Sequence, residues 1–570
     1  LHILRSFSRP CRLAKTSIIG HTMELLSVNK SYFELQRLHY RPDTLSLLNS
    51  LCSMHIQEKP SSEPASDLLA KHIPHLCALP DLTLQKDAPS SSEPLRIGVL
   101  LSGGQAPGGH NVVIGLFEGL RAFNKETKLF GFIKGPLGLI RGLYKDLDIS
   151  VIYDYYNAGG FDMLSSSREK IKTKEQKSAI LATVKKMKLH GLLIVGGDNS
   201  NTDTAMLAEY FIEHNCPTAV IGVPKTIDGD LKNAWIETPL GFHTSCRTYS
   251  EMIGNLEKDV LSTRKYHHFV KLMGEQASHS TLECGLQTLP NITLIGEEVA
   301  VQHASLQSLS LSIAQGLIER FHRGKDYSTI LIPEGLIKQI PDTKRLIQEL
   351  NTLIAEEQFS VHNLDQQLSP MAIETFSSLP ENIRDQLLLD RDSYGNIRVS
   401  KIAIEELLAS LVSKEISKLE PTMSFSPVTH FLGYESRASF PSNFDSNYGL
   451  ALGIAASLFL VRGKTGYMVT IGNLAETYTE WTIAATPLYK MMHLEKRFNQ
   501  ETPVIKTDSV SPDAPMAKYL HKMKEICLLE DSYRFPGPLQ YFEEQALVDQ
   551  RPLTLLWEKG KLSENNATKF

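Results

Sequence analysis

Three short apolar segments, each ending in a turn rich in glycine or acidic residues, most constrain how this chain can fold. They occupy residues 96–102, 192–195 and 219–223, and stretches with helical character lie between them. Strands that alternate with helices over such distances predict a parallel, doubly wound α/β sheet. Ligands of such sheets bind at the carboxyl ends of the strands, and all three turns are expected there. The sequence therefore predicts that the turns share one edge of a sheet.

The first turn, SGGQAPGGHN over residues 102–111, has the composition of an anion-binding loop. Four glycines between a strand and a helix let backbone N–H groups approach an anion, and the helix N-terminus adds its positive dipole. The spacing excludes a P-loop and does not match the dinucleotide-binding G-x-G-x-x-G motif. A tight turn without a ligand would need the same glycines, so this turn alone leaves both interpretations open.

The second and third turns add charged side chains at the same edge. GGDNSN places Asp198 at the end of a strand, where a carboxylate can hold Mg²⁺ or cap a helix. PKTIDGD is more specific, because it combines Lys225 and Thr226 with two carboxylates. Asp228 and Asp230 are two residues apart and point the same way in an extended loop. A carboxylate near a cation is a candidate base, and a lysine neutralises phosphate, so the turns predict phosphoryl transfer.

Composition excludes several other classes of protein. The 570 residues are 42% hydrophobic and carry 59 basic against 64 acidic side chains, which is typical of a globular chain without a nucleic-acid partner. The longest apolar run, residues 450–461, is too short to cross a bilayer and predicts a buried helix. Seven scattered cysteines form no disulfide or zinc pattern and predict reduced thiols. We therefore expect a cytoplasmic protein without a membrane partner.

The motifs SGGQAPGGHN, GGDNSNTD and VPKTIDGDLKN resemble the signatures of phosphofructokinases. Lys225 stands where ATP-dependent members have glycine, and with the GGHN ending it resembles the pyrophosphate-dependent branch of the long bacterial and plant type. The similarity covers about residues 95–473 and continues through LMGEQASHSTLECGLQTLPNITLIGEEVA, LIPEGLI, LPENIRDQLLLDRDSYGNIRVSKI and HFLGYESRASFPSNFD. The resemblance implies a reversible glycolytic reaction: Mg²⁺-dependent transfer of phosphate from pyrophosphate to the 1-hydroxyl of fructose 6-phosphate, giving fructose 1,6-bisphosphate and phosphate.

The same resemblance and the residue patterns together predict two doubly wound, Rossmann-like α/β/α lobes with the active site between them. Residues 1–22 are basic and lack acidic residues, which fits a targeting peptide or an over-extended start, and we favour the latter. We expect strands at 269–273, 293–295, 329–332 and 467–471 in the second lobe, and a linker at 80–94. The expected divisions are a helical extension and linker at 23–94, a first lobe with the donor and catalytic loops at 95–240, a second lobe with the sugar-phosphate site at 241–340 and 422–485, a helical insertion at 341–421, and a helical and loop extension at 486–570.

The resemblance also implies roles for individual residues. Asp228 would accept the proton of the sugar hydroxyl, while Lys225 and Arg168 would stabilise the transferring phosphoryl group. Asp198 and Asp230 would bind Mg²⁺. Lys265 and Tyr266 match positions that reach a neighbouring subunit's site, which implies a homo-oligomer such as a dimer, or a pairing with a homologous subunit. The donor would contact Gly104 and Asn199, and the other substrate-binding positions are Thr226, Ile227, Met273, Gly274, Glu275, Glu334, Tyr434, Glu435, Ser436 and Arg437.

Four residues in the binding loops depart from the family's pattern. Asn199 replaces the second aspartate of GGDD, which excludes ATP in the pyrophosphate branch, and Glu275 replaces the arginine of MGR. Ser167 and Ser436 replace glycines, and each added side chain could narrow a close approach. Two alternatives follow: ATP as the donor, or a weakly active or non-catalytic regulatory subunit. If Glu275 faces the sugar phosphate, Glu275→Arg is expected to lower the Michaelis constant for that substrate.

Overall fold

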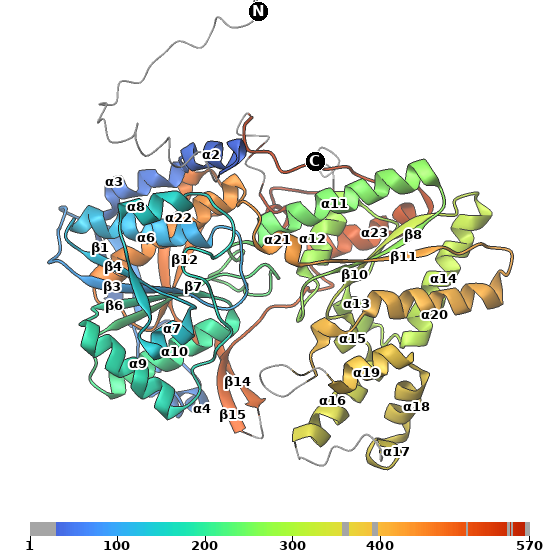
Figure 1. Cartoon of the computed structure of the whole chain (residues 1–570), viewed down its shortest axis with the longest axis horizontal. Helices are drawn as coiled ribbons and strands as arrows, with labels where there is room; N and C mark the ends of the chain where they lie inside the picture. The colour runs from blue at the N-terminus through green and yellow to red at the C-terminus, as the bar shows by residue number, and fades with distance from the viewer. Residues whose placement is uncertain are drawn as a thin grey trace, which may run out of the picture.

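Two mostly parallel sheets organise the chain into two lobes (Figure 1). The computed structural model describes residues 30–355, 364–389, 391, 397–497, 500–543, 548 and 551–564, so the predicted N-terminal segment 1–22 lies outside the described residues. One sheet has seven strands and the other has four. The predicted α/β class with two lobes is confirmed.

The seven-stranded sheet forms the first lobe. In spatial order its strands are β13 (Thr482–Pro487), β12 (Tyr467–Gly472), β7 (Ala219–Pro224), β6 (Gly191–Gly196), β3 (Arg96–Leu101), β4 (Lys128–Phe132) and β5 (Tyr144–Leu147). The two edge strands β5 and β13 run antiparallel to their neighbours. Strands β6 and β7 are buried along their whole length, which explains their continuous apolar sequences.

Helices cover both faces of this sheet (Figure 1). One face carries α6 (Gly109–Phe123), α8 (Ile149–Ile152) and α22 (Asn443–Val461), and the other carries α7 (Pro136–Arg141), α9 (Lys174–Met187) and α10 (Asp198–Glu213). Helix α22 is long and apolar enough to cross a membrane by length and composition, yet 94% of that stretch is buried inside the fold. The predicted buried helix at 450–461 is thus confirmed. A Cβ at Gly453 would lie 2.1 Å from the carbonyl oxygen of Val112, so α22 contacts α6 backbone to backbone.

The four-stranded sheet forms the second lobe. In spatial order its strands are β11 (Pro427–Leu432), β8 (His267–Leu272), β10 (Ser328–Pro333) and β9 (Ile292–Thr293), and every pairing is parallel. Its helices are α11 (Phe242–Thr263), α12 (His279–Thr288), α13 (Gly296–Val301), α14 (Leu306–His322), α15 (Leu336–Gln339) and α21 (Tyr434–Arg437). Helices α11 and α12 pack on one face of the sheet and α14 on the other.

The assignment of residues 467–471 to the second lobe was wrong. Strand β12 pairs with β7 in the first lobe, with Tyr467 opposite Ile221, and α22 before it packs on α6. An apolar strand carries no local mark of which sheet it will join, because its partner lies more than two hundred residues away in sequence. The fourth strand of the second lobe is β11, which the sequence analysis did not anticipate.

The segment before the first lobe is only partly helical. It contains α2 (Tyr32–His39), α3 (Leu48–Leu51), α4 (Asp67–Ala70), α5 (Pro74–Cys77) and an antiparallel pair, β1 (Met54–Lys59) and β2 (Asp81–Lys86). Strand β2 lies inside the predicted linker at 80–94, where Leu82 and Leu84 alternate with polar residues as a strand requires. Buried Arg37 fastens this segment to α22, because its Nη1 donates to Asn443 Oδ1 at 2.9 Å.

The described parts of the predicted insertion are helical. They hold α16 (Pro341–Ala355), α17 (Leu364–Gln367), α18 (Pro370–Ser378), α19 (Glu381–Leu389) and α20 (Ile404–Leu419). These helices share one apolar core with α14 and the second sheet. Buried Lys271 of β8 pairs with Glu405 of α20 at 3.0 Å and donates to the carbonyl oxygen of Ile402 at 3.2 Å. The insertion is therefore fastened to the strand that leads into the turn at residues 273–276.

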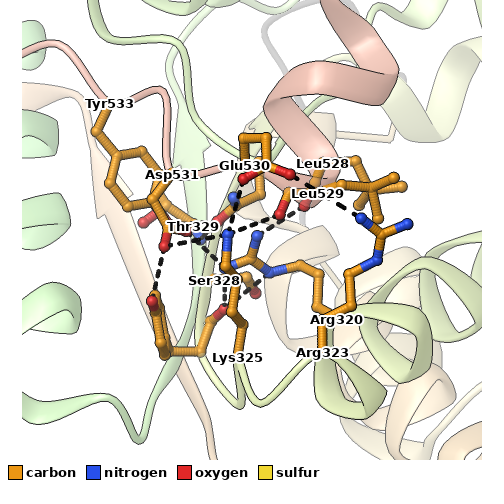
Figure 2. A network of polar contacts seen from close by, with 12 residues as sticks. Arg320, Arg323, Lys325, Ser328, Thr329, Leu528, Leu529, Glu530, Asp531 and Tyr533 are labelled. Atoms are coloured by element: carbon orange, nitrogen blue, oxygen red, sulfur yellow. Dashed lines mark hydrogen bonds and ion pairs between the residues drawn. The ribbon is translucent and has the colours of Figure 1, made fainter.

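The C-terminal extension includes a hairpin as well as helices. It consists of β14 (Met492–Arg497), β15 (Gln500–Ile505), α23 (Pro515–Leu529) and α25 (Leu553–Glu558). Figure 2 shows the polar network that attaches its middle part to the second lobe. Buried Arg320 pairs with Asp531 at 3.0 Å, and the Nζ of Lys325 donates to the carbonyl oxygen of Leu529 at 2.8 Å. The six cysteines in the described part of the chain are free thiols.

Candidate active site

The three turns that follow β3, β6 and β7 meet at the carboxyl ends of neighbouring strands. Strand β6 lies between the other two and pairs in parallel with both. A cavity of about 430 Å³ opens at this edge and is lined by residues of both lobes. The predicted site residues that line it are Gly104, Arg168, Asp198, Asn199, Lys225, Thr226, Ile227, Asp228, Asp230, Met273, Glu275, Glu334, Tyr434 and Arg437.

The first turn brings its backbone close to cations from two other segments. Gly103 has a φ of 80°, in the left-handed region that glycine adopts without strain. The Nζ of buried Lys225 donates to the carbonyl oxygen of Gly104 at 2.6 Å. A Cβ at Gly104 would lie 3.6 Å from the Cζ of Arg437, which comes from the second lobe. The guanidinium and the ammonium thus approach the same turn, where an anion would be attracted.

Three carboxylates lie at the floor of the cavity. Burial raises the pKa of Asp228 to about 6 even though Arg437 opposes the shift. Burial also raises the pKa of Asp230 well above its usual value, and the charges of Asp228 and Asp198 add to that effect. Burial lowers the pKa of Lys225 to about 8. Carboxylate oxygens are the hard ligands that Mg²⁺ prefers, and all three of these aspartates line the cavity.

Asn199 is held between a cation and a carboxylate. Its Oδ1 accepts from the Nζ of Lys170 at 3.0 Å, and its Nδ2 donates to Asp198 Oδ1 at 3.3 Å. The amide therefore occupies a defined position in the turn that follows β6. Asp203 lines the same part of the cavity, and burial raises its pKa to about 6.

The second lobe supplies polar and aromatic side chains to the cavity. Glu334 Oε2 accepts from the backbone N–H of Gly274 at 2.9 Å, and burial raises the pKa of Glu334 to about 7. Tyr434 is 61% exposed, and the Cζ of Arg437 lies 4.9 Å from the centre of its ring. Glu334 Oε1 and Arg437 Nε are buried and have no hydrogen-bond partner among the described residues. Both residues line the cavity, which gives it a carboxyl group and a guanidinium that favour a polar ligand.

Five predicted site residues do not line the cavity. Gly274 contributes its backbone N–H to Glu334, and Glu435 Oε2 accepts from the backbone N–H of Gly433 at 2.8 Å. Ser436 Oγ donates to the hydroxyl of Tyr249 at 2.7 Å. The remaining two, Lys265 and Tyr266, precede β8, at the opposite end of that strand from the turn at residues 273–276.

The two serines that replace glycines do not narrow the cavity. Ser436 is fully buried and its hydroxyl faces Tyr249, while Ser167 contacts the first turn through its backbone, accepting from Gly103 N–H at 3.0 Å. Neither lines the cavity. The expectation that each serine would restrict a close approach finds no support in this geometry, because neither residue belongs to the cavity lining.

Glu275 lines the cavity but has a cation partner. Its Oε1 lies 2.7 Å from the Nζ of Lys338, on α15. The Glu275 side chain is 40% exposed. The negative charge of Glu275 is therefore paired rather than isolated, and the compensating lysine is 63 residues away in sequence.

The sequence analysis missed the contribution of the insertion. Arg391, Arg398, Ser400 and Lys401 line the cavity, and Lys271 fastens the segment that carries the last three. The basic residues in LLLDRDSYGNIRVSKI, at positions 387–402, are the local signal for this contribution, whereas the sequence pattern predicts that stretch only as part of a helical insertion.

Comparisons with known proteins agree with this geometry. The phosphofructokinase family model matches residues 96–460. The pyrophosphate–fructose 6-phosphate 1-phosphotransferase of Porphyromonas gingivalis is 41% identical over 547 residues, covering 93% of this chain and 99% of that protein. Subunit beta 2 of the enzyme of that name from Arabidopsis thaliana is 42% identical, covering 96% and 94%. The crystal structure of a pyrophosphate-dependent phosphofructokinase from Nitrosospira multiformis covers 79% of this chain and 94% of that chain, with a TM-score of 0.51 and 15% identity, and so supports the fold alone.

Proposed function

The chain belongs to the phosphofructokinase family, and we propose that it transfers a phosphoryl group from pyrophosphate to the 1-hydroxyl of fructose 6-phosphate. The products would be fructose 1,6-bisphosphate and phosphate, in a nearly reversible glycolytic step. The observation that carries the proposal is the buried ammonium of Lys225, which contacts the first glycine-rich turn. In ATP-dependent members of the family, glycine stands at the sequence position of this lysine. A buried cation there would attract the small, highly charged pyrophosphate.

Asp228 would accept the proton of the attacking hydroxyl. Burial raises its pKa to about 6, which lets the carboxylate be ionised at neutral pH and still take up a proton during the reaction. Lys225 and Arg168, which line the same cavity, would stabilise the negative charge on the transferring phosphoryl oxygens. Thr226 Oγ1 accepts from the backbone N–H of Asp228 at 3.1 Å, a contact that would hold the base in place.

We also propose that the carboxylates of Asp198 and Asp230 hold Mg²⁺. The donor set fits, because both side chains line the cavity and offer only oxygen ligands. When bound, the ion would supply charge neutralisation for the phosphate groups. The protein would keep its remaining cations, Arg437 and Lys225, for the phosphoryl oxygens and the sugar phosphate.

The donor can be tested directly. The purified chain is assayed for fructose 1,6-bisphosphate with Mg²⁺, with pyrophosphate and ATP offered in parallel. Turnover with pyrophosphate and none with ATP is the expected result, because Asn199 still fills the space of the excluding aspartate and is held by Lys170. Activity with ATP alone would overturn the assignment of pyrophosphate as the phosphoryl donor. Binding of fructose 6-phosphate without turnover would support a non-catalytic subunit. The main reason to expect such a subunit was the negative charge of Glu275, and that charge is paired with Lys338.

The proposed partners are pyrophosphate, fructose 6-phosphate and a second subunit. Lys265 and Tyr266 lie outside the cavity of their own chain, as expected for residues that complete a neighbour's site in a homo-oligomer such as a dimer. The plant relatives are named as subunits, among them an Arabidopsis thaliana subunit alpha 2 that is 40% identical over 78% of this chain. A pairing with a homologous subunit is the alternative assembly. A cytoplasmic location stays a prediction.

A further inference from the structure

The acceptor side of the cavity is bordered by two turns that share an ion pair. Glu275 follows β8, and Lys338 lies on the short helix that follows β10, the neighbouring strand. The Nζ of Lys338 lies 2.7 Å from Glu275 Oε1, and the two side chains are 29% and 40% exposed. The family's pattern has an arginine in place of Glu275. In this chain the positive charge therefore comes from the other turn.

The backbones of the two turns interlock beneath this pair. The N–H of Gly335 donates to the carbonyl oxygen of Gly274 at 3.2 Å, and the N–H of Gly274 donates to Glu334 Oε2 at 2.9 Å. A Cβ at Gly335 would lie only 2.5 Å from the carbonyl oxygen of Glu275, so the turns touch without a gap. Any repulsion between the side chains above would act on the backbone that carries Met273 and Glu334 into the cavity.

We propose that Glu275 and Lys338 form a positioning ion pair, which holds the turn at 273–276 against the turn at 334–338 and cancels the negative charge of Glu275 beside the sugar phosphate. The proposal rests on the proposed function, because it concerns the acceptor site of that reaction. The pair has no net charge whichever of the two positions carries the cation. Contact between the two turns therefore needs opposite charges at positions 275 and 338, and does not need a cation at position 275. Glu275→Arg alone would bring two cations together and disturb the site.

The test compares the wild type with Glu275→Arg, Lys338→Glu and the double exchange. The Michaelis constant for fructose 6-phosphate and kcat are measured at saturating pyrophosphate, together with the thermal unfolding temperature. Each single change should raise the Michaelis constant about tenfold, and the double exchange should return it to within about threefold of the wild type. The value of kcat is compared as well, and any change in a single variant should likewise be reversed in the double exchange.

An exposed ion pair provides the matched control. Glu415 and Lys418 of α20 lie 2.7 Å apart and do not line the cavity, so exchanging their charges should leave the Michaelis constant unchanged. A lower Michaelis constant for Glu275→Arg alone would overturn the proposal. The proposal would also be overturned if the fold-change in the Michaelis constant of the double exchange equals the product of the two single fold-changes.

The unfolding temperature separates this proposal from the proposed function. If the wild type shows no turnover with pyrophosphate, the proposed function fails and the pair is judged by stability alone. Glu275→Arg and Lys338→Glu should then each lower the unfolding temperature, and the double exchange should restore most of the loss. If the double exchange lowers the unfolding temperature by the sum of the two single losses, the two residues do not stabilise each other and the proposal is overturned.

Discussion

Replacing Lys225 by methionine removes a buried cation from the donor side while keeping the length and the apolar stem of the side chain. Lys225 is 4% exposed, so water screens its charge little. At about 4 Å and an effective dielectric constant of about 20, a lysine and a phosphate oxygen attract by roughly 4 kcal/mol. Since about 1.4 kcal/mol corresponds to a factor of ten in rate, Lys225→Met should lower kcat/KM for pyrophosphate by roughly 10²–10³ at pH 7.

The pH dependence of the same parameter gives a second, independent expectation. Burial lowers the pKa of Lys225 to about 8, so the cation is present below that pH and is lost above it. Because kcat/KM reports the groups of the free enzyme, it should fall about tenfold between pH 7 and pH 9 in the wild type. In Lys225→Met this decline should be absent.

The assay follows fructose 1,6-bisphosphate formation from pH 6.5 to 9.5 at constant free Mg²⁺. Pyrophosphate titrates identically in every protein, so the ratio of the wild-type curve to the Lys225→Met curve isolates the lysine. Lys232→Met is the matched control, because Lys232 pairs with Glu558 and does not line the cavity. The kcat/KM of Lys232→Met should still fall between pH 7 and pH 9, as in the wild type. A decline that persists in Lys225→Met, or a loss of less than tenfold at pH 7, would refute the assignment of Lys225 to the donor.

Asp228→Asn should lower kcat by about 10²–10⁴-fold, because an amide cannot take up the proton, while the unfolding temperature stays level or rises; retained turnover would refute the role of base. Lys271→Met should lower the free energy of unfolding by about 3–5 kcal/mol, because it leaves the buried carboxylate of Glu405 without a cation. Adding Glu405→Leu should recover most of that loss in urea denaturation, and no recovery would contradict the buried ion pair. Ser436→Gly should leave the Michaelis constant for fructose 6-phosphate within about twofold, because its hydroxyl faces Tyr249; a clear fall would show that the serine narrows the site.

The parts of the site that the sequence predicts are those built by short stretches of chain. Lys225, Asp228 and Asp230 lie in one turn of seven residues, and the strand before that turn is a continuous apolar run. Their convergence with Gly104 and Asp198 follows from the rule that parallel strands end at one edge of a sheet. Local spacing is sufficient for such features because the geometry of a strand and its turn depends on neighbouring residues.

The features that escaped prediction depend on contacts between distant segments. Lys338 and Glu275 are 63 residues apart, and nothing in either local sequence marks them as partners. Arg398 and Lys401 reach the cavity because the buried ammonium of Lys271 holds the neighbouring backbone at Ile402. Strand β12 likewise finds its sheet only through tertiary pairing. In each case the contact can be predicted only when the relative positions of distant segments are already known, and local sequence patterns do not give those positions.

The return of the chain to the first lobe has a consequence for how the protein is made. Helix α22 and strands β12 and β13 complete a lobe whose other strands are synthesised before residue 225. A ribosome must therefore produce the chain as far as Pro487 before the first lobe can close. Until α22 has been synthesised, the face of α6 that receives it stays uncovered. The second lobe and its insertion, which end at β11 and α21, can form while the earlier lobe is still open, so folding during synthesis should begin in the middle of the chain.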